Sequence, residues 1–273
     1  MKKGKPNNTL LNYFASREGN ASVSKSDHKT NGGHNGKAGS DHPVHRSVIN
    51  TQGPNKKFVN KRLTENEMIA NAFGFLLAGH QTTCFALSYC LHELALNPSV
   101  QQILYDEING ATDLDGQIPY DSVLARLPYL DAVLSETLRR HFAVSPISRV
   151  AAIDYTLGNT GITIKAGQQI EIPVYSIHNS DKYFVDPFRF NPDRFLVQNR
   201  RNIRPYTLLS FSSGPRNCVG ERFAMLTIKM TLAHMIRKYR FNTCTETDDP
   251  IRYQKFTHFM LPERLIVRIE PRV

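Results

Sequence analysis

Residues 211–220 read Phe-Ser-Ser-Gly-Pro-Arg-Asn-Cys-Val-Gly. Gly214 and the proline after it predict a tight turn, and Gly220 predicts the start of a helix. Cys218 therefore lies at a helix amino terminus, with the cation of Arg216 two residues away. Partial positive charge at such a position stabilises a thiolate, which is the form of cysteine that binds metals. The stretch predicts a metal-binding thiolate, although an isolated cysteine is more often a small buried apolar residue.

A long helix is predicted well before this stretch, over about residues 64–96. Thr64 and Glu67 have the spacing of a capping box, and an apolar run without proline continues from them to Leu96. The dipeptide Asn97-Pro98 ends the run. Because the run is apolar on most faces, the helix is predicted to cross the middle of a domain.

The remaining pattern predicts further helices and a few short strands. Apolar residues that alternate with polar ones around glycine turns predict strands in hairpins over residues 149–173. A Pro- and Asn-rich segment, residues 186–210, is predicted to be irregular but packed. The fold class is therefore α+β and mostly α. The other predicted elements are helices from Ser99 to about Asn109, from about Pro128 to His141 and from about Val219 to Tyr239, and strands near 253–259 and 264–270.

Charge and composition divide the chain near residue 63. Residues 1–62 hold 12 Lys and Arg against 3 acidic residues, whereas residues 63–273 hold 22 against 21. Residues 1–63 are predicted to be a flexible basic arm, largely disordered, and residues 64–273 a folded domain. A basic arm suits nucleic acid or an anionic membrane surface as an alternative partner. The arm lacks interleaved aromatic residues and any recognisable binding module, so a solvated arm is favoured.

The composition disfavours several other classes of protein. No apolar run is long enough to span a membrane, a secretory signal is not expected from the first residues, and the four cysteines are too scattered for a disulfide framework. A reducing compartment is therefore expected. Zinc is a minor alternative, because its candidate ligands would all lie on one apolar helix without the loop that separates ligand pairs in zinc sites. Those ligands are His80, Cys84, Cys90 and His92.

The stretch at 211–220 resembles the haem-binding loop of the cytochrome P450 family, Phe-x-x-Gly-x-Arg-x-Cys-x-Gly, at every fixed position. The resemblance covers residues 64–273 and implies the carboxy-terminal half of that fold. It implies that the cysteine thiolate binds the iron of haem b, that the arginine pairs with a haem propionate and that the phenylalanine packs near the sulfur. The residues of this sequence that take these positions are Phe211, Gly214, Arg216, Cys218 and Gly220.

A second family motif is Glu136-Thr-Leu-Arg139, which places a carboxylate and a guanidinium at i,i+3 on one helix face. Alone, such a pair is usually an exposed ion pair of small energy. The segment Asn191-Pro-Asp-Arg-Phe adds Arg194, and the family joins such an arginine to the pair. The resemblance implies a buried structural triad that holds the segment before the cysteine loop.

A third motif, Ala-Gly-His-Gln-Thr-Thr at residues 78–83, resembles the oxygen-activation motif of the family. It implies that Ala78 lets the helix pass close to the haem and that Thr82 hydrogen-bonds dioxygen or the water that supplies its proton. The alternative is a hydroxyl that bonds back to its own helix. Gln81 stands where the family usually has an acid, and an amide does not exchange a proton at neutral pH. Arg149 falls where the family often places another propionate-binding arginine.

The implied activity is that of a haem-thiolate monooxygenase that inserts one oxygen atom from O2 into an apolar substrate. The implied partners are an NADPH-dependent reductase or another acidic electron donor, a lipophilic small molecule and O2, with no nucleic acid. A basic face before the loop, at Arg200, Arg201 and Arg204, suits an acidic partner. The implied location is the cytoplasmic face of the endoplasmic reticulum membrane.

The family's domain is about twice as long as the matching part of this chain, so the sequence is expected to be a truncated form. Membrane association is expected only through an amino-terminal anchor that the sequence does not include. A non-catalytic fragment that binds haem weakly or not at all is therefore the alternative to a working monooxygenase.

Overall fold

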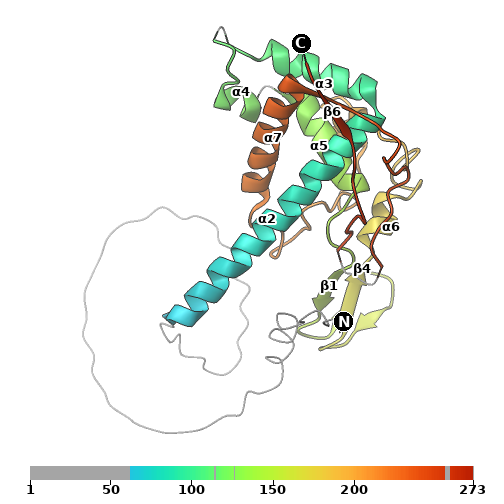
Figure 1. Cartoon of the computed structure of the whole chain (residues 1–273). Helices are drawn as coiled ribbons and strands as arrows, with labels where there is room; N and C mark the ends of the chain where they lie inside the picture. The colour runs from blue at the N-terminus through green and yellow to red at the C-terminus, as the bar shows by residue number, and fades with distance from the viewer. Residues whose placement is uncertain (1–61, 114, 126, 256–258, 273) are drawn as a thin grey trace, which may run out of the picture. The chain divides into compact units, whose positions relative to one another are not determined.

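The computed structural model describes residues 62–272, except residues 114, 126 and 256–258. It is mostly helical with small antiparallel strand pairs, as predicted (Figure 1). The predicted arm, residues 1–63, lies outside the described residues up to residue 61. None of the described helices has the length and apolar character needed to cross a membrane.

The helices follow the predicted boundaries within a few residues at four places in the chain. The α-helices are α2 (Glu65–Leu96), α3 (Pro98–Gly110), α4 (Tyr120–Ala125), α5 (Pro128–Arg140), α6 (Val174–His178) and α7 (Glu221–Lys238), and the 3-10 turns are η1 (Pro192–Phe195) and η2 (Arg200–Asn202). The sequence pattern missed α4 and α6, because both are shorter than two turns and show too little periodicity.

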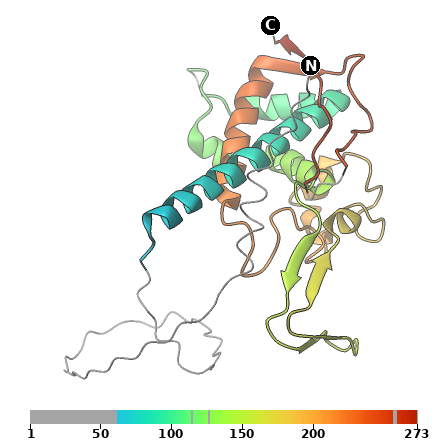
Figure 2. The ribbon, with the colours of Figure 1, turned by 60° about the horizontal axis from the view of Figure 1, so that its bottom comes forward.

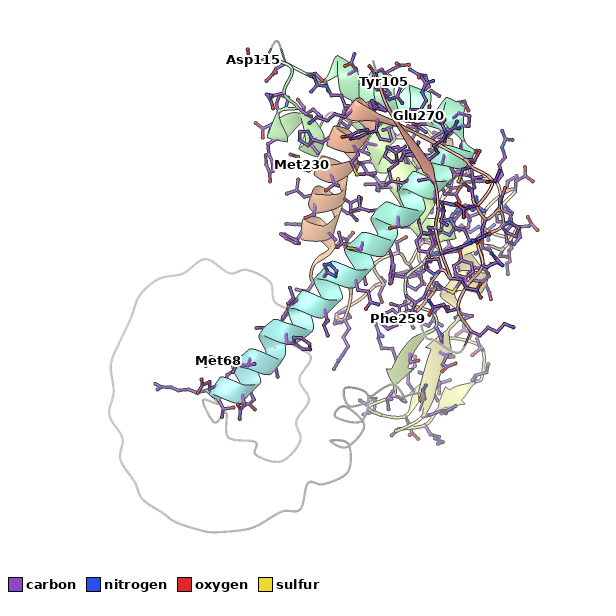
Figure 3. The ribbon with its side chains drawn as sticks, viewed as in Figure 1. Met68, Tyr105, Asp115, Met230, Phe259 and Glu270 are labelled. Carbon is purple, nitrogen blue, oxygen red and sulfur yellow. The ribbon has the colours of Figure 1, made fainter. Side chains whose placement is uncertain are left out.

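Helix α2 begins with the predicted capping box. The Glu67 amide donates to Thr64 Oγ1 at 3.3 Å, and the Thr64 amide donates to Glu67 Oε2 at 2.9 Å. The buried residues of α2 all lie from Ala86 onward, whereas its first turns extend away from the other described helices, with Met68 near the end (Figure 3). Only the carboxy-terminal part of α2 therefore enters the core, although its apolar faces predicted burial along its whole length.

The core lies where α2, α3, α5 and α7 pack together. Each helix contributes aliphatic side chains that are fully buried, so most of the hydrophobic stabilisation comes from this cluster. Among its members are Leu94, Leu104, Leu130, Leu134, Leu232 and Ile236. The cluster fixes the second half of α2 against α7, which begins just after Cys218.

Three antiparallel pairs make up the named strands among the described residues. Strand β1 (Ile147–Val150) pairs with β4 (Gln169–Ile172), and this pair extends away from the helices (Figure 2). Two short strands, β2 (Tyr155–Thr156) and β3 (Thr163–Ile164), pair beyond it, and β5 (Tyr239–Asn242) pairs with β6 (Arg268–Pro271).

The closing strands differ from the prediction. The strand expected near 264–270 is β6, but its partner β5 follows α7 directly and was not predicted. Of the strand expected near 253–259, residues 256–258 lie outside the described part of the chain, and the described residues form isolated bridges at Tyr253 and Phe259. A pairing between segments so far apart in the chain leaves no local sequence signal.

Candidate active site

The cysteine loop folds as a tight turn in front of α7. The Asn217 amide donates to the Gly214 carbonyl at 3.0 Å, and the Cys218 amide donates to the Phe211 carbonyl at 2.9 Å. Gly214 has a φ of +83°, which requires glycine in practice. Gly220 is the residue before the first turn of α7. Cys218 is a free, exposed cysteine just before this helix, at the position that the sequence predicted.

A cavity of about 380 Å³ adjoins this loop. One wall is formed by the loop itself, through Phe211, Arg216 and Cys218. Another wall comes from α2, and a third from the chain that leads from α5 into β1. Residues that line these two walls are Thr82, Thr83, Ala86, Phe142, Val144, Ile147 and Arg149. The structure thus brings five residues predicted from distant parts of the sequence to a single cavity.

Of the three predicted site residues on α2, one lines the cavity and two do not. Thr82 lines the cavity, but its hydroxyl donates to the Ala78 carbonyl at 2.6 Å, the local helix bond that was the alternative for this residue. Gln81 is exposed and, like Ala78, is not part of the cavity lining. Apart from its chain neighbours and the backbone of its own helix, no atom of the described residues lies within 4 Å of the place where Gly79 would carry a Cβ. The helix surface at this motif is therefore open.

Serine residues that were not predicted as site residues also line the cavity. Arg149 Nη2 donates to Ser212 Oγ at 3.2 Å, which joins β1 to the cysteine loop. Ser210 Oγ is buried and has no hydrogen-bond partner among the described residues. No sequence signal distinguishes these serines from other loop serines. Their hydrogen bonds depend on which strand lies next to the cysteine loop, and the local sequence does not show that.

The cavity suits a haem group. A thiol and two guanidinium groups line it together with mostly apolar side chains. Ser210, whose buried hydroxyl has no hydrogen-bond partner among the described residues, is also part of the lining. A thiolate is a haem-iron ligand, and guanidinium groups pair with carboxylates in a fixed geometry. The lining residues that could hold such a group are Cys218, through its sulfur, and Arg149 and Arg216, through their guanidinium groups.

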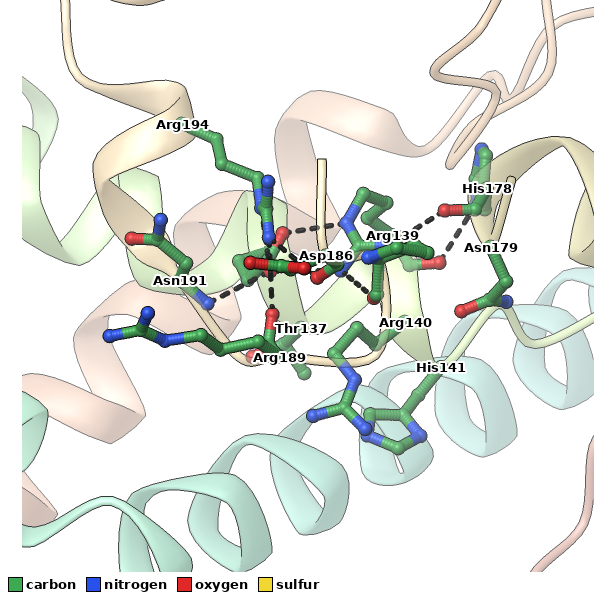
Figure 4. A network of polar contacts seen from close by, with 12 residues as sticks. Thr137, Arg139, Arg140, His141, His178, Asn179, Asp186, Arg189, Asn191 and Arg194 are labelled. Atoms are coloured by element: carbon green, nitrogen blue, oxygen red, sulfur yellow. Dashed lines mark hydrogen bonds and ion pairs between the residues drawn. The ribbon is translucent and has the colours of Figure 1, made fainter. Parts of the chain in front are cut away.

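The predicted triad forms, and none of its three residues is among those that line the cavity. Figure 4 shows Arg139 and Arg194 in this network. Arg139 forms a two-pronged ion pair with Glu136, at 2.7 Å and 2.9 Å, and neither side chain is exposed. Arg194 Nε lies 3.3 Å from Glu136 Oε1, and the Asn191 amide donates to the same oxygen at 2.9 Å. Arg139 also donates to the Pro187 carbonyl at 2.6 Å. The triad therefore ties α5 to the irregular segment that precedes the cysteine loop.

His178 extends this network toward the cysteine loop and was not predicted. Its Nδ1 lies 2.9 Å from the Arg139 carbonyl, and the Leu209 amide donates to its Nε2 at 2.9 Å. The ring is fully buried. Burial lowers the pKa of His178 to about 4, so the ring is neutral at pH 7 and protonated only on Nδ1. A second proton on Nε2 would remove the bond to Leu209, two residues before Phe211.

We expect this histidine to make stability fall in mild acid. Its pKa is lower in the folded chain than the ordinary 6.5, so unfolding takes up a proton and falling pH favours the unfolded chain. The loss begins near pH 6.5, ends near pH 4 and amounts to about 3 kcal/mol. Urea unfolding at pH 7, 6 and 5 measures it. His178→Gln should flatten the dependence, and an equal slope in both proteins would contradict this assignment.

The zinc alternative receives little support from the geometry. Cys84 Sγ lies 3.7 Å from His80 Nε2 on the exposed part of α2, whereas Cys90 and His92 are buried. Within the part of the chain that the structure describes, no three His, Cys, Asp or Glu side chains form a group able to hold a metal ion. A single Cys–His pair lacks the four ligands of a structural zinc site.

Comparison of the sequence with known proteins identifies a family. The family model described as Cytochrome P450 matches residues 24–268. The chain is 34% identical to cytochrome P450 3A12 of Canis lupus familiaris over 225 residues, which are 82% of this chain and 44% of that protein. It is 37% identical to cytochrome P450 3A13 of Mus musculus over 208 residues, 76% of this chain and 41% of that protein. It is 40% identical to the probable cytochrome P450 6a14 of Drosophila melanogaster over 195 residues, 71% of this chain and 38% of that protein. The chain thus spans about two fifths of the length of these relatives.

Proposed function

The chain belongs to the cytochrome P450 family, and on that premise we propose that it carries the thiolate side of a haem monooxygenase site. The observation that supports this function is the single cavity shared by Cys218, Arg216, Arg149 and Thr82. The overall reaction is insertion of one oxygen atom from O2 into an apolar organic substrate. The mostly apolar lining of the cavity suits such a substrate.

Each residue of the cavity has a distinct task in this proposal. The bound haem supplies the activation of dioxygen. Cys218 holds the iron as a thiolate, and Arg149 and Arg216 hold the two propionates by charge-assisted hydrogen bonds. Thr82 positions a proton-carrying water through its hydroxyl, for which it gives up the bond to the Ala78 carbonyl. Glu136, Arg139 and Arg194 keep the cysteine loop in place and take no part in the chemistry.

The test is the absorption spectrum of the purified chain with haem, reduced and exposed to carbon monoxide. A working site gives the strongly red-shifted Soret band of a thiolate-bound haem. The alternative, a non-catalytic fragment, predicts no such band from this chain while a full-length relative shows it. Either result shows whether this chain binds haem through a thiolate. Neither changes the family assignment, which rests on the sequence match.

Gln81 gives a second prediction, on the efficiency of the reaction. We expect Gln81→Glu to raise the fraction of reductant that ends in product by about twofold or more, because a carboxyl exchanges protons and an amide does not. Product and reductant consumption are measured together in a haem-loaded, reductase-coupled assay. Asn71→Asp on an earlier exposed turn of the same helix serves as the control for added charge. An unchanged ratio in Gln81→Glu would show that proton supply does not pass through this position.

The proposed electron donor is an NADPH-dependent reductase or another acidic protein. Arg200, Arg201 and Arg204 are exposed in and after η2, on the segment that leads to the cysteine loop. Exposed cations speed encounter with an acidic partner. The proposed location is the cytoplasmic face of the endoplasmic reticulum membrane, by analogy with the relatives. Nucleic-acid binding rests only on residues 1–62, and salt-dependent binding to duplex DNA or RNA would be needed to support it.

A further inference from the structure

Ser212 is the only serine among the described residues that has a positive φ, +64°. Side chains with a Cβ are disfavoured in this left-handed region, where glycine fits without strain. A serine at this place therefore carries a steric cost that a glycine would avoid. Such an outlier at the edge of a site is a reason to ask what the side chain does.

The hydroxyl of Ser212 contacts the guanidinium of Arg149. Arg149 Nη2 donates to Ser212 Oγ at 3.2 Å, and Arg149 Nη1 donates to the Ser148 carbonyl at 2.8 Å. Ser148 belongs to β1 and Ser212 to the cysteine loop, so the guanidinium is held from two separate segments. Both Arg149 and Ser212 line the cavity that also contains Cys218.

We propose that Ser212 is a positioning residue that fixes the guanidinium of Arg149 for a haem propionate. A guanidinium has five donors in a planar fork, so two fixed bonds set the plane and leave the other N–H groups for a carboxylate. A freely rotating arginine would lose side-chain entropy on binding, and a tethered one has lost it already. The inference rests on the proposed function, because it takes the carboxylate from the haem.

Haem affinity of the full chain tests this role, with two probes that differ only in the carboxylates. Haemin and haemin dimethyl ester are each titrated into three proteins, the unchanged chain and the variants Ser212→Ala and Ser213→Ala, and binding is followed by absorbance. Ser213→Ala is the control, because Ser213 is an exposed neighbour in the same loop. Ser212→Ala should lower the affinity for haemin by about fivefold and the affinity for the ester by less than about twofold. Ser213→Ala should change neither. In the background Arg149→Ala, the substitution Ser212→Ala should have no further effect.

Ser212→Gly separates positioning from backbone strain. It removes the hydroxyl and the strain together, so the thermal unfolding temperature should rise while the affinity for haemin falls as in Ser212→Ala. Equal losses for haemin and its ester, or no loss for haemin, would overturn the positioning role alone. Failure of the unchanged chain to bind haemin would overturn the proposed function and this inference with it.

Discussion

Replacing Glu136 with Gln is expected to lower the free energy of unfolding by about 3–5 kcal/mol. The side chain of Glu136 has no exposed surface and accepts from Arg139, Arg194 and the Asn191 amide. An amide of the same size leaves the buried cation of Arg139 without its counter-charge, and it turns one acceptor into a donor. The loss is a large part of the total stability of a domain, which is typically 5–15 kcal/mol. Urea unfolding followed by circular dichroism measures it.

The matched control is an exposed ion pair in the same chain. Asp154 Oδ2 lies 2.8 Å from Lys165 Nζ, and more than half of each side chain is exposed. Asp154→Asn should therefore cost less than about 1 kcal/mol, since water and salt screen such pairs. A loss in Glu136→Gln as small as that in Asp154→Asn would show that the triad does not hold the fold together.

Replacing Cys218 with Ala is expected to weaken haem binding by about a hundredfold or more, because it removes the ligand of the iron itself. The fold should survive, since Cys218 is exposed and lies outside the buried core. Haemin titration followed by absorbance gives the affinity, and thermal unfolding of the haem-free chain shows whether the fold is intact.

Cys84→Ala is the control for loss of a thiol. Cys84 is also free and exposed, but it is not among the residues that line the cavity. The Cys84→Ala variant should bind haemin with the same affinity as the unchanged chain. If Cys218→Ala kept the full affinity, or if Cys84→Ala lost as much, the cavity would not bind haem through the cysteine loop.

Local sequence patterns were sufficient to predict the elements that build the site. The capping box at Thr64 and the dipeptide Asn97-Pro98 mark helix ends by backbone chemistry, and the structure places the ends there. The cysteine loop was predictable for the same reason. Its turn depends on Gly214, whose positive φ few other residues adopt.

The contacts between distant segments were not predictable from these patterns. His178 joins Arg139 to Leu209, and nothing near it in the sequence indicates either partner. The bond from Arg149 to Ser212 spans 63 residues. The direction of the Thr82 hydroxyl was left between two alternatives, because helix spacing places the residue on a face but does not choose its hydrogen-bond partner.

Helix α2 is buried only along the part where other described elements pack against it. Its apolar residues continue through the first turns, yet Phe75 and Leu76 are each more than 60% exposed in the described part of the chain. An apolar pattern indicates that a helix face prefers an apolar neighbour, but the face becomes buried only where such a neighbour is present.

The X-ray absorption spectrum at the iron edge, recorded on the purified chain loaded with haem, is the most direct test of the central claim. Coordination of the iron by the Cys218 thiolate predicts one sulfur in the first shell, in addition to the porphyrin nitrogens, and its absence from Cys218→Ala. A first shell of nitrogen and oxygen alone in the unchanged chain would contradict the assignment.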